Sequence, residues 1–217
     1  MKFDFNEVKN FEEHIELSIP NYLTLDKIFR EISHEYAQPE SILVDLGCST
    51  GRFISSLEKI EGVDYIGVDE VDMTDRRKDF SFIRGDAENI FKLKGSNKNV
   101  SVIISMFFLQ FLGSSKRNRM LQIIKEQIDK GAVFLVAEKV FLKDSRLQQT
   151  LHRLHIQEKR KGFKDKDILD KDKQLSISMY CKYESELEKE LHCLGEVSKV
   201  WQSFNFMGYV VKKGHSA

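Results

Sequence analysis

The residues best suited to chemistry lie in one short loop, residues 44–51, which reads VDLGCSTG. An acid, Asp45, ends an apolar run, and glycines follow at positions 47 and 51. Because glycine has no Cβ, such a loop lets backbone N–H groups and the start of the next helix approach a ligand closely. The spacing does not match the G-x-G-x-x-G loop of dinucleotide sites, and the G-K-[ST] ending of a phosphate-binding loop is missing. What fits is a D-x-G-x-S-x-G loop.

Further acids follow the next two apolar segments. Asp69 ends residues 64–69, and a carboxylate there can accept hydrogen bonds from both hydroxyls of a ribose. Asp86 and Ala87 follow the segment after that. Each acid taken alone could equally cap a loop or a helix. In this order they predict a single ligand site, because ligands of open α/β sheets bind at the carboxyl ends of the strands.

The elements that must position these residues are short apolar strands alternating with helices. We expect strands at 41–46, 64–69, 80–84, 100–106 and 132–138, and helices at 7–17, 22–37, 52–60 and 116–128. Apolar residues recur at helical spacing in the second helix, and Pro39 follows its end. Strands that are apolar on both faces and alternate with helices indicate a parallel sheet covered on both sides.

The last third of the chain has a different pattern. We expect a helix at 144–160, a polar segment at 161–175 and a helix at 183–194. Two strands follow, at 196–201 and 204–211, joined by a tight turn near Gln202 and Ser203. The pattern predicts an α/β, Rossmann-like fold: a seven-stranded, mostly parallel sheet with an antiparallel last strand and N-terminal helices.

A length of 217 residues suits one domain. We therefore expect a single ligand-binding domain over residues 1–217. Residues 1–40 would form a helical cover, and residues 144–175 an insert or lid over the open edge of the sheet.

Composition and charge exclude several classes. Lys+Arg and Asp+Glu both number 34, so no overall positive field attracts nucleic acid, and we expect no direct nucleic-acid binding. The most apolar stretch, 102–112, is about half the ~20 residues that a membrane span needs, so we expect no membrane association. Three widely spaced cysteines and a charged N-terminus favour the cytoplasm.

The loop and several flanking motifs resemble known enzymes. D-x-G-x-S-x-G is similar to the D/E-x-G-x-G-x-G motif of S-adenosylmethionine (SAM)-dependent methyltransferases, with Ser49 replacing the middle glycine. Most of the chain resembles the carboxy-S-adenosylmethionine synthase family. The motifs that carry this resemblance are FDF at 3–5, SIPNY at 18–22, DLGCS at 45–49, LQFL at 109–112, EK at 138–139 and FNF at 204–206.

The resemblance implies a class I methyltransferase fold and a SAM-dependent transferase. Members of that family make carboxy-SAM from SAM and prephenate, for wobble-uridine modification in tRNA processing. It implies SAM or carboxy-SAM as the cofactor, a small-molecule substrate and a homodimer. No metal site and no catalytic side chain are assigned. The implied cofactor-binding residues are Tyr22, Asp45, Gly47, Cys48, Ser49, Gly51, Asp69, Glu70, Asp86, Ala87 and Met106.

Three features depart from the family pattern. Met106 stands where the family has an asparagine, so the amide donor is missing there. The span 69–80 is too short for a helix that the family has in this place. Counting without a gap puts Asp172 where the family has an arginine that clamps the extra carboxylate of carboxy-SAM, and an aspartate would repel that group. Lys171 or Lys173 could replace the arginine through a one-residue slip.

Two alternative functions stay open at this point. One is an ordinary SAM-dependent methyltransferase, which would release S-adenosylhomocysteine. The other is a non-catalytic partner protein that keeps the fold for assembly, an interpretation that Met106 and Asp172 favour.

For two other features we prefer a structural interpretation to a functional one. His152, His155 and Glu158 share roughly one helical face and could bind a metal, but a packed or solvated face is the better interpretation. Cys48 lies inside the ligand loop with no base evident nearby, so we interpret it as a small packing residue rather than a nucleophile.

Overall fold

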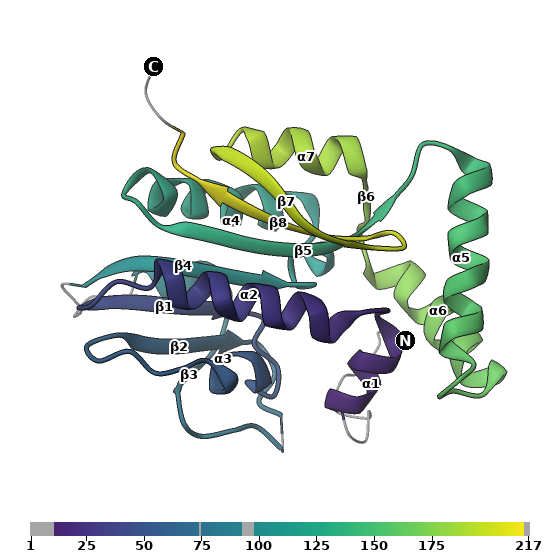
Figure 1. The fold of residues 1–217 in the computed structure, drawn as a ribbon, viewed down its shortest axis with the longest axis horizontal. Helices are drawn as coiled ribbons and strands as arrows, with labels where there is room; N and C mark the ends of the chain where they lie inside the picture. Colours follow the sequence, from purple (N-terminus) through teal and green to yellow (C-terminus); the bar gives the residue numbers. More distant parts are fainter. Residues whose placement is uncertain (1–10, 74, 93–97, 215–217) are drawn as a thin grey trace.

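A mixed β-sheet forms the centre of the molecule, and the computed structural model describes residues 11–73, 75–92 and 98–214 (Figure 1). The FDF motif at 3–5 and the first residues of the helix expected at 7–17 lie outside these ranges. The strand order is β3-β2-β1-β4-β5-β8-β7. The strands are β1 (Ser41–Leu46), β2 (Asp64–Asp69), β3 (Ser81–Arg84), β4 (Asn99–Met106), β5 (Val133–Phe141), β7 (Glu196–Ser203) and β8 (Phe206–Lys212).

The pairing confirms the fold expected from the sequence. Neighbouring strands from β3 to β5 are parallel, whereas β8 is antiparallel to both β5 and β7. A two-residue strand, β6 (Lys182–Tyr183), adds a short parallel pairing at the end of β5 that the sequence did not predict.

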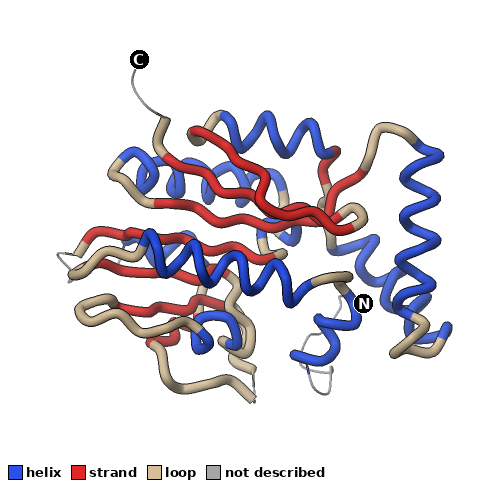
Figure 2. Tube along the Cα trace, viewed as in Figure 1, coloured by secondary structure: helices blue, strands red, loops and turns tan. Residues whose placement is uncertain are grey.

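Helices cover both faces of the sheet and one of its ends (Figure 2). One face carries α2 (Tyr22–Tyr36) and α3 (Arg52–Ser56), and the other carries α4 (Ser114–Asp129) and α7 (Glu184–His192). The remaining helices, α1 (Phe11–Ser18), α5 (Ser145–Lys159) and α6 (Asp165–Ser178), stand at the end of the sheet that the carboxyl ends of the parallel strands face. The short 3₁₀ helices are η2 (Ala87–Lys92) and η3 (Leu109–Phe111).

Strand β5 shows why the sheet is buried on both faces. Successive side chains of a strand point to opposite faces. Phe134 and Val136 pack into the core beneath α4 and α7, while Val133, Leu135 and Ala137 pack into the core beneath α2 and α3. An unbroken apolar strand therefore serves two cores at once.

Three boundaries differ from the sequence prediction. The polar segment expected at 161–175 forms α6, whose only buried residue is Ile168, so its apolar periodicity is weak. The helix expected at 52–60 ends at Ser56, where the chain becomes extended. The turn between the last strands lies at Phe204 and Asn205, because the Asn205 amide donates to the carbonyl of Val140 and fixes the corner there.

No helix in the described part of the chain is both long and apolar enough to cross a membrane.

A buried ion-pair network joins β5 to two helices. Arg117 on α4 is 2% exposed and donates to Glu138 on β5 at 2.9 Å and to Glu190 on α7 at 2.6 Å. Lys182 on β6 adds a further ion pair with Glu190 at 3.0 Å. Burial raises the pKa of Glu138 despite the attraction of Arg117. The guanidinium of Arg117 therefore offsets the free-energy cost of burying the Glu138 carboxylate on β5.

We predict that Arg117→Leu lowers the free energy of unfolding by about 3–5 kcal/mol, because it leaves Glu138 charged and buried without a partner. Urea unfolding would measure the change. Arg119→Leu on the same helix is the control, since Arg119 pairs with Glu88 at an exposed site and its loss should matter little. Equal losses in the two variants would contradict the prediction.

Candidate functional site

A cavity of about 440 Å³ lies at the carboxyl ends of the parallel strands, bordered by residues of α1, α5 and α6. This volume is in the range of small-molecule sites. Its wall includes eight of the eleven predicted cofactor-binding residues: Tyr22, Asp45, Gly47, Cys48, Ser49, Asp69, Glu70 and Met106. Gly51, Asp86 and Ala87 are not part of the wall.

The loop after β1 is a tight backbone turn. Gly47 and Ser49 have positive φ angles of 72° and 50°. A Cβ at Gly47 would lie 2.5 Å from the Phe108 ring, so only glycine fits there. Gly51 also has a positive φ, and a Cβ there would lie 2.1 Å from the Phe80 ring. The structure therefore gives Gly51 a role in shaping the loop.

Asp69 holds this loop against the end of β2. Its carboxylate accepts from the N–H of Ser49 at 2.9 Å and from the N–H of Val71 at 2.9 Å. Each carboxylate oxygen can accept more than one hydrogen bond, so Asp69 keeps acceptor capacity toward the cavity. One side chain thus shapes the site and remains available to a ligand.

Two acidic side chains, Asp45, which is buried, and Asp69, which is half-buried, make this end of the cavity negative. Asp45 is 4% exposed, and burial together with the charge of Asp69 raises its pKa to about 7. Burial also raises the pKa of Asp69. A cationic ligand would relieve both effects, because opposite charge favours the ionised form of a carboxyl group.

Asp86 and Ala87 lie away from the cavity wall. The Asp86 carboxylate pairs with Lys116 at 3.0 Å and accepts from the N–H of Glu88 at 3.1 Å. These contacts outweigh partial burial and lower the pKa of Asp86. Lys116 also reaches Glu70, at 3.3 Å, so it links Asp86 to a residue of the wall. Ala87 is buried in the core. Their contact with a cofactor stays a prediction.

Tyr22 lies at the start of α2, where it is buried with the guanidinium of Arg52 5.5 Å from the centre of its ring. Burial raises its pKa, so the phenol stays neutral and can donate a hydrogen bond. Burial likewise raises the pKa of the Cys48 thiol. A protonated thiol agrees with a packing role for Cys48.

Where β5, α5 and α6 border the cavity, its wall carries cations that the sequence largely failed to predict. Lys139 follows Glu138 on β5, Lys159 ends α5, and Lys171 lies on α6. Lys171 contacts His14 and donates to Ser18 at 3.3 Å. Across the ranges that the structure describes, no carboxylate forms an ion pair with Lys139 or Lys159. Three lysine side chains therefore border one space, and two of them, Lys139 and Lys159, have no carboxylate ion pair among the described residues.

Burial weakens the charge of two of these lysines. It lowers the pKa of Lys159 to about 8, with help from Lys139. It lowers the pKa of Lys171 to about 7, with help from Lys159. Asp172 is not part of the wall and acts on Lys159 only through its charge. Lys171 lines the cavity and Asp172 does not, while the assignment of Asp172 to the family's clamp position stays a prediction.

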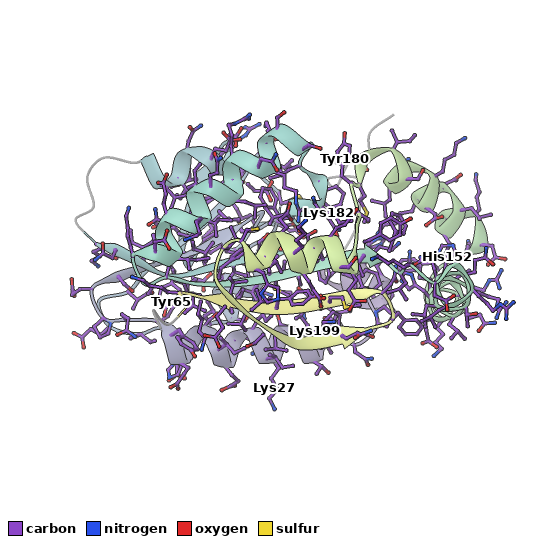
Figure 3. The ribbon with its side chains drawn as sticks, turned by 90° about the horizontal axis from the view of Figure 1, so that it is seen from above. Lys27, Tyr65, His152, Tyr180, Lys182 and Lys199 are labelled. Carbon is purple, nitrogen blue, oxygen red and sulfur yellow. The ribbon has the colours of Figure 1, made fainter. Side chains whose placement is uncertain are left out.

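The histidines of α5 do not form a metal centre. His155 is buried, its Nε2 lies 2.8 Å from the carbonyl of Ser18, and its ring meets Phe206 edge-on at 5.2 Å. Burial lowers its pKa to about 3, so the ring is neutral. His152 lies on the same helix (Figure 3). Among the described residues, no three His, Cys, Asp or Glu side chains are arranged to hold a metal ion.

The fold and the loop after β1 are those of the class I SAM-dependent methyltransferases. A SAM-dependent methyltransferase from Archaeoglobus fulgidus has a TM-score of 0.58 at 14% identity, covering 95% of this chain and 100% of that one. The plantazolicin methyltransferase BamL has a TM-score of 0.59 at 13% identity, covering 93% of this chain and 87% of that one. At these identities the likeness establishes the fold alone.

Curated relatives narrow the class to one family. The carboxy-S-adenosyl-L-methionine synthase of Idiomarina loihiensis is 30% identical over 224 residues, which cover 97% of this chain and 92% of the relative. The enzyme of the same name from Hydrogenovibrio crunogenus is 29% identical over 225 residues, covering 98% and 89%. The chain belongs to the carboxy-S-adenosyl-L-methionine synthase family and is a SAM-dependent transferase. No family model matches it.

We predict that Asp45→Asn raises the melting temperature at pH 8 by at least ~3 °C. The folded-state pKa of Asp45, about 7, lies above the unfolded value of about 3.9, so ionised Asp45 costs stability, and this cost disappears as the pH falls below 7. The gain should therefore shrink at pH 5. Differential scanning calorimetry at both pH values would measure it.

Asp86→Asn is the matched control. The fold lowers the pKa of the Asp86 carboxyl group, so the charge of Asp86 stabilises the protein at pH 8. Asp86→Asn should therefore melt at a lower temperature. The same direction of change in both variants at pH 8 would refute the assignment of Asp45 as a destabilising buried charge.

Proposed function

We propose that the chain is a carboxy-SAM synthase, which binds SAM in the cavity and carboxylates it with prephenate as the second substrate. The observation that carries the proposal is the division of the cavity by charge. Asp45 and Asp69 lie on the neighbouring strands β1 and β2, at what we call the negative end of the cavity. The positive end is formed by Lys139 on β5, which β4 separates from β1, and by Lys159 and Lys171 on α5 and α6. A cationic cofactor with an anionic partner matches both ends.

The negative end suits the cofactor. Asp45 offers a buried charge to the methionine ammonium, and Asp69 offers free acceptor capacity to the ribose hydroxyls. Backbone groups from Gly47 to Ser49 approach the amino-acid portion, and Tyr22 covers it from α2. When bound, SAM supplies a sulfonium that makes its methyl protons removable. The chain contributes positioning and electrostatic stabilisation.

The positive end suits carboxylates of the second substrate and of the product. A single arginine would bind a carboxylate through its rigid fork, whereas lysines act as point charges. Lys139 and Lys159 bring two such charges to one space, and Lys171 adds further N–H donors there. Asp172 lies outside the cavity wall, so a carboxylate in the cavity would meet these lysines rather than the Asp172 side chain.

The setting of the enzyme belongs to the same proposal. We propose one domain over residues 1–217, with residues 1–40 and 144–175 covering the site, working as a homodimer in the cytoplasm. The substrates are small molecules, and the product serves tRNA modification without direct contact between this chain and nucleic acid. The neutral net charge supports that separation.

Mass spectrometry of the product tests the reaction. With SAM and prephenate, the purified protein should yield a sulfonium heavier than SAM by one CO₂, and mass spectrometry of the protein as isolated should detect the same compound. S-adenosylhomocysteine as the only product would favour an ordinary methyltransferase. Neither product would favour a non-catalytic partner protein.

We predict that Lys159→Gln weakens carboxy-SAM binding about tenfold or more, because a buried ammonium that would contact the carboxylate is lost. Binding of SAM, which lacks that carboxylate, should change much less. Isothermal titration calorimetry with both ligands would show the difference. Lys166→Gln, at an exposed position of α6, is the control. If the two variants bound carboxy-SAM equally well, Lys159 would have no part in the clamp.

A further inference from the structure

Gln110 is a buried polar residue of the cavity wall to which the proposed function gives no role. It lies in η3, directly after β4, and is 4% exposed. In the sequence it is the second residue of the LQFL motif at 109–112. An amide buried at this depth needs hydrogen-bond partners for its oxygen and for both of its N–H groups.

The orientation of this amide is fixed by the backbone of β5. The side-chain Oε1 of Gln110 accepts from the N–H of Lys139 at 2.8 Å. A backbone N–H can only donate, so the oxygen must face β5 and the nitrogen must point away from it. The main-chain carbonyl of Gln110 accepts from the N–H of Tyr180 at 2.7 Å. Tyr180 lies on the connection from α6 to α7, close to Lys182 of β6 (Figure 3). Gln110 is thus held by β5 through its side chain and by this connection through its main chain.

The amide nitrogen has no such partner. Among the described residues none accepts a hydrogen bond from Gln110 Nε2. The nitrogen is also not one of the unpartnered side-chain atoms sealed among protein atoms. Because the residue lines the cavity, this donor is open to a ligand there.

The surroundings indicate what the ligand offers to this donor. Lys139 follows Glu138 on the strand that Gln110 contacts, and Lys159 and Lys171 line the same cavity. The amide nitrogen of Gln110 and the lysine side chains all donate hydrogen bonds. An ionised carboxylate only accepts hydrogen bonds, so it suits this set of donors. A neutral hydroxyl would leave the positive charge uncompensated.

We propose that Gln110 is a specificity residue, whose Nε2 donates a hydrogen bond to the carboxylate that distinguishes carboxy-SAM from SAM. This rests on the proposed function and adds a geometric contact to the charge of the lysines. Its fixed orientation costs no reorganisation when the carboxylate arrives. A site built to donate to an oxygen discriminates against a ligand that lacks it.

Gln110→Glu tests the proposal, because it replaces the donor NH₂ by oxygen while keeping an acceptor for the N–H of Lys139. We expect the dissociation constant for carboxy-SAM to rise about tenfold or more, with a much smaller change for SAM. Calorimetric titration with each ligand measures both. Gln148→Glu is the matched control, since Gln148 Oε1 accepts from the N–H of Leu142 at 2.9 Å outside the cavity wall.

The outcomes separate the two proposals. Wild-type protein that fails to bind carboxy-SAM overturns the proposed function, and the role of Gln110 falls with it. Wild-type protein that binds carboxy-SAM, with unchanged selectivity in Gln110→Glu, overturns the role of Gln110 alone. Circular dichroism checks the fold of the variant. Should that variant not fold, Gln110→Met removes the donor without adding charge, and the same loss of selectivity is expected.

Discussion

The hydrogen bond from the Ser49 N–H to the Asp69 carboxylate, 2.9 Å long, is the contact on which the site depends. It ties the loop after β1 to the end of β2, while Gly47 lets the Phe108 ring close against the turn. The N–H groups of Gly47 and Cys48 also donate to the carbonyl of Val68, so the loop is tied to the end of β2 at several points. The pairing of β1 with β2 brings Asp69 near Asp45, and the charge of Asp69 adds to burial in raising the pKa of Asp45.

The sequence was sufficient for the framework and for the negative end of the site. Apolar runs predicted the strands other than β6, and the glycine spacing predicted the loop. Both patterns involve residues that are close together in the sequence. The positive end was not predictable in this way. Lys139, Lys159 and Lys171 come from the consecutive elements β5, α5 and α6, and only the packing of these elements brings the lysines to one cavity. In the sequence, lysines in charged helices look like a solvated surface. The weak apolar pattern of α6 hid the helix that brings Lys171 to the cavity.

Several polar groups of the cavity wall are buried without a full set of hydrogen-bond or ion-pair partners. Asp45 is a buried acid, Lys159 is a buried base, and Gln110 has an unused donor. The Arg117 network shows the opposite arrangement, in which every buried charge has a partner. A ligand that supplied the missing partners at the cavity would also stabilise the folded state.

Helix α1 is fastened to the body of the molecule by side-chain contacts, among them the ion pair of Glu16 with Arg52 at 2.6 Å. The carbonyl of Ser18 meets His155 at 2.8 Å, and Leu17 packs where Gly162 leaves room for it. None of these contacts involves the strand pairing of the sheet. Separation of α1 from α5 would thus be a local opening, with its own free energy, independent of global unfolding. The residence time of a bound molecule would then depend on the contacts that hold α1 in place rather than on the stability of the whole domain.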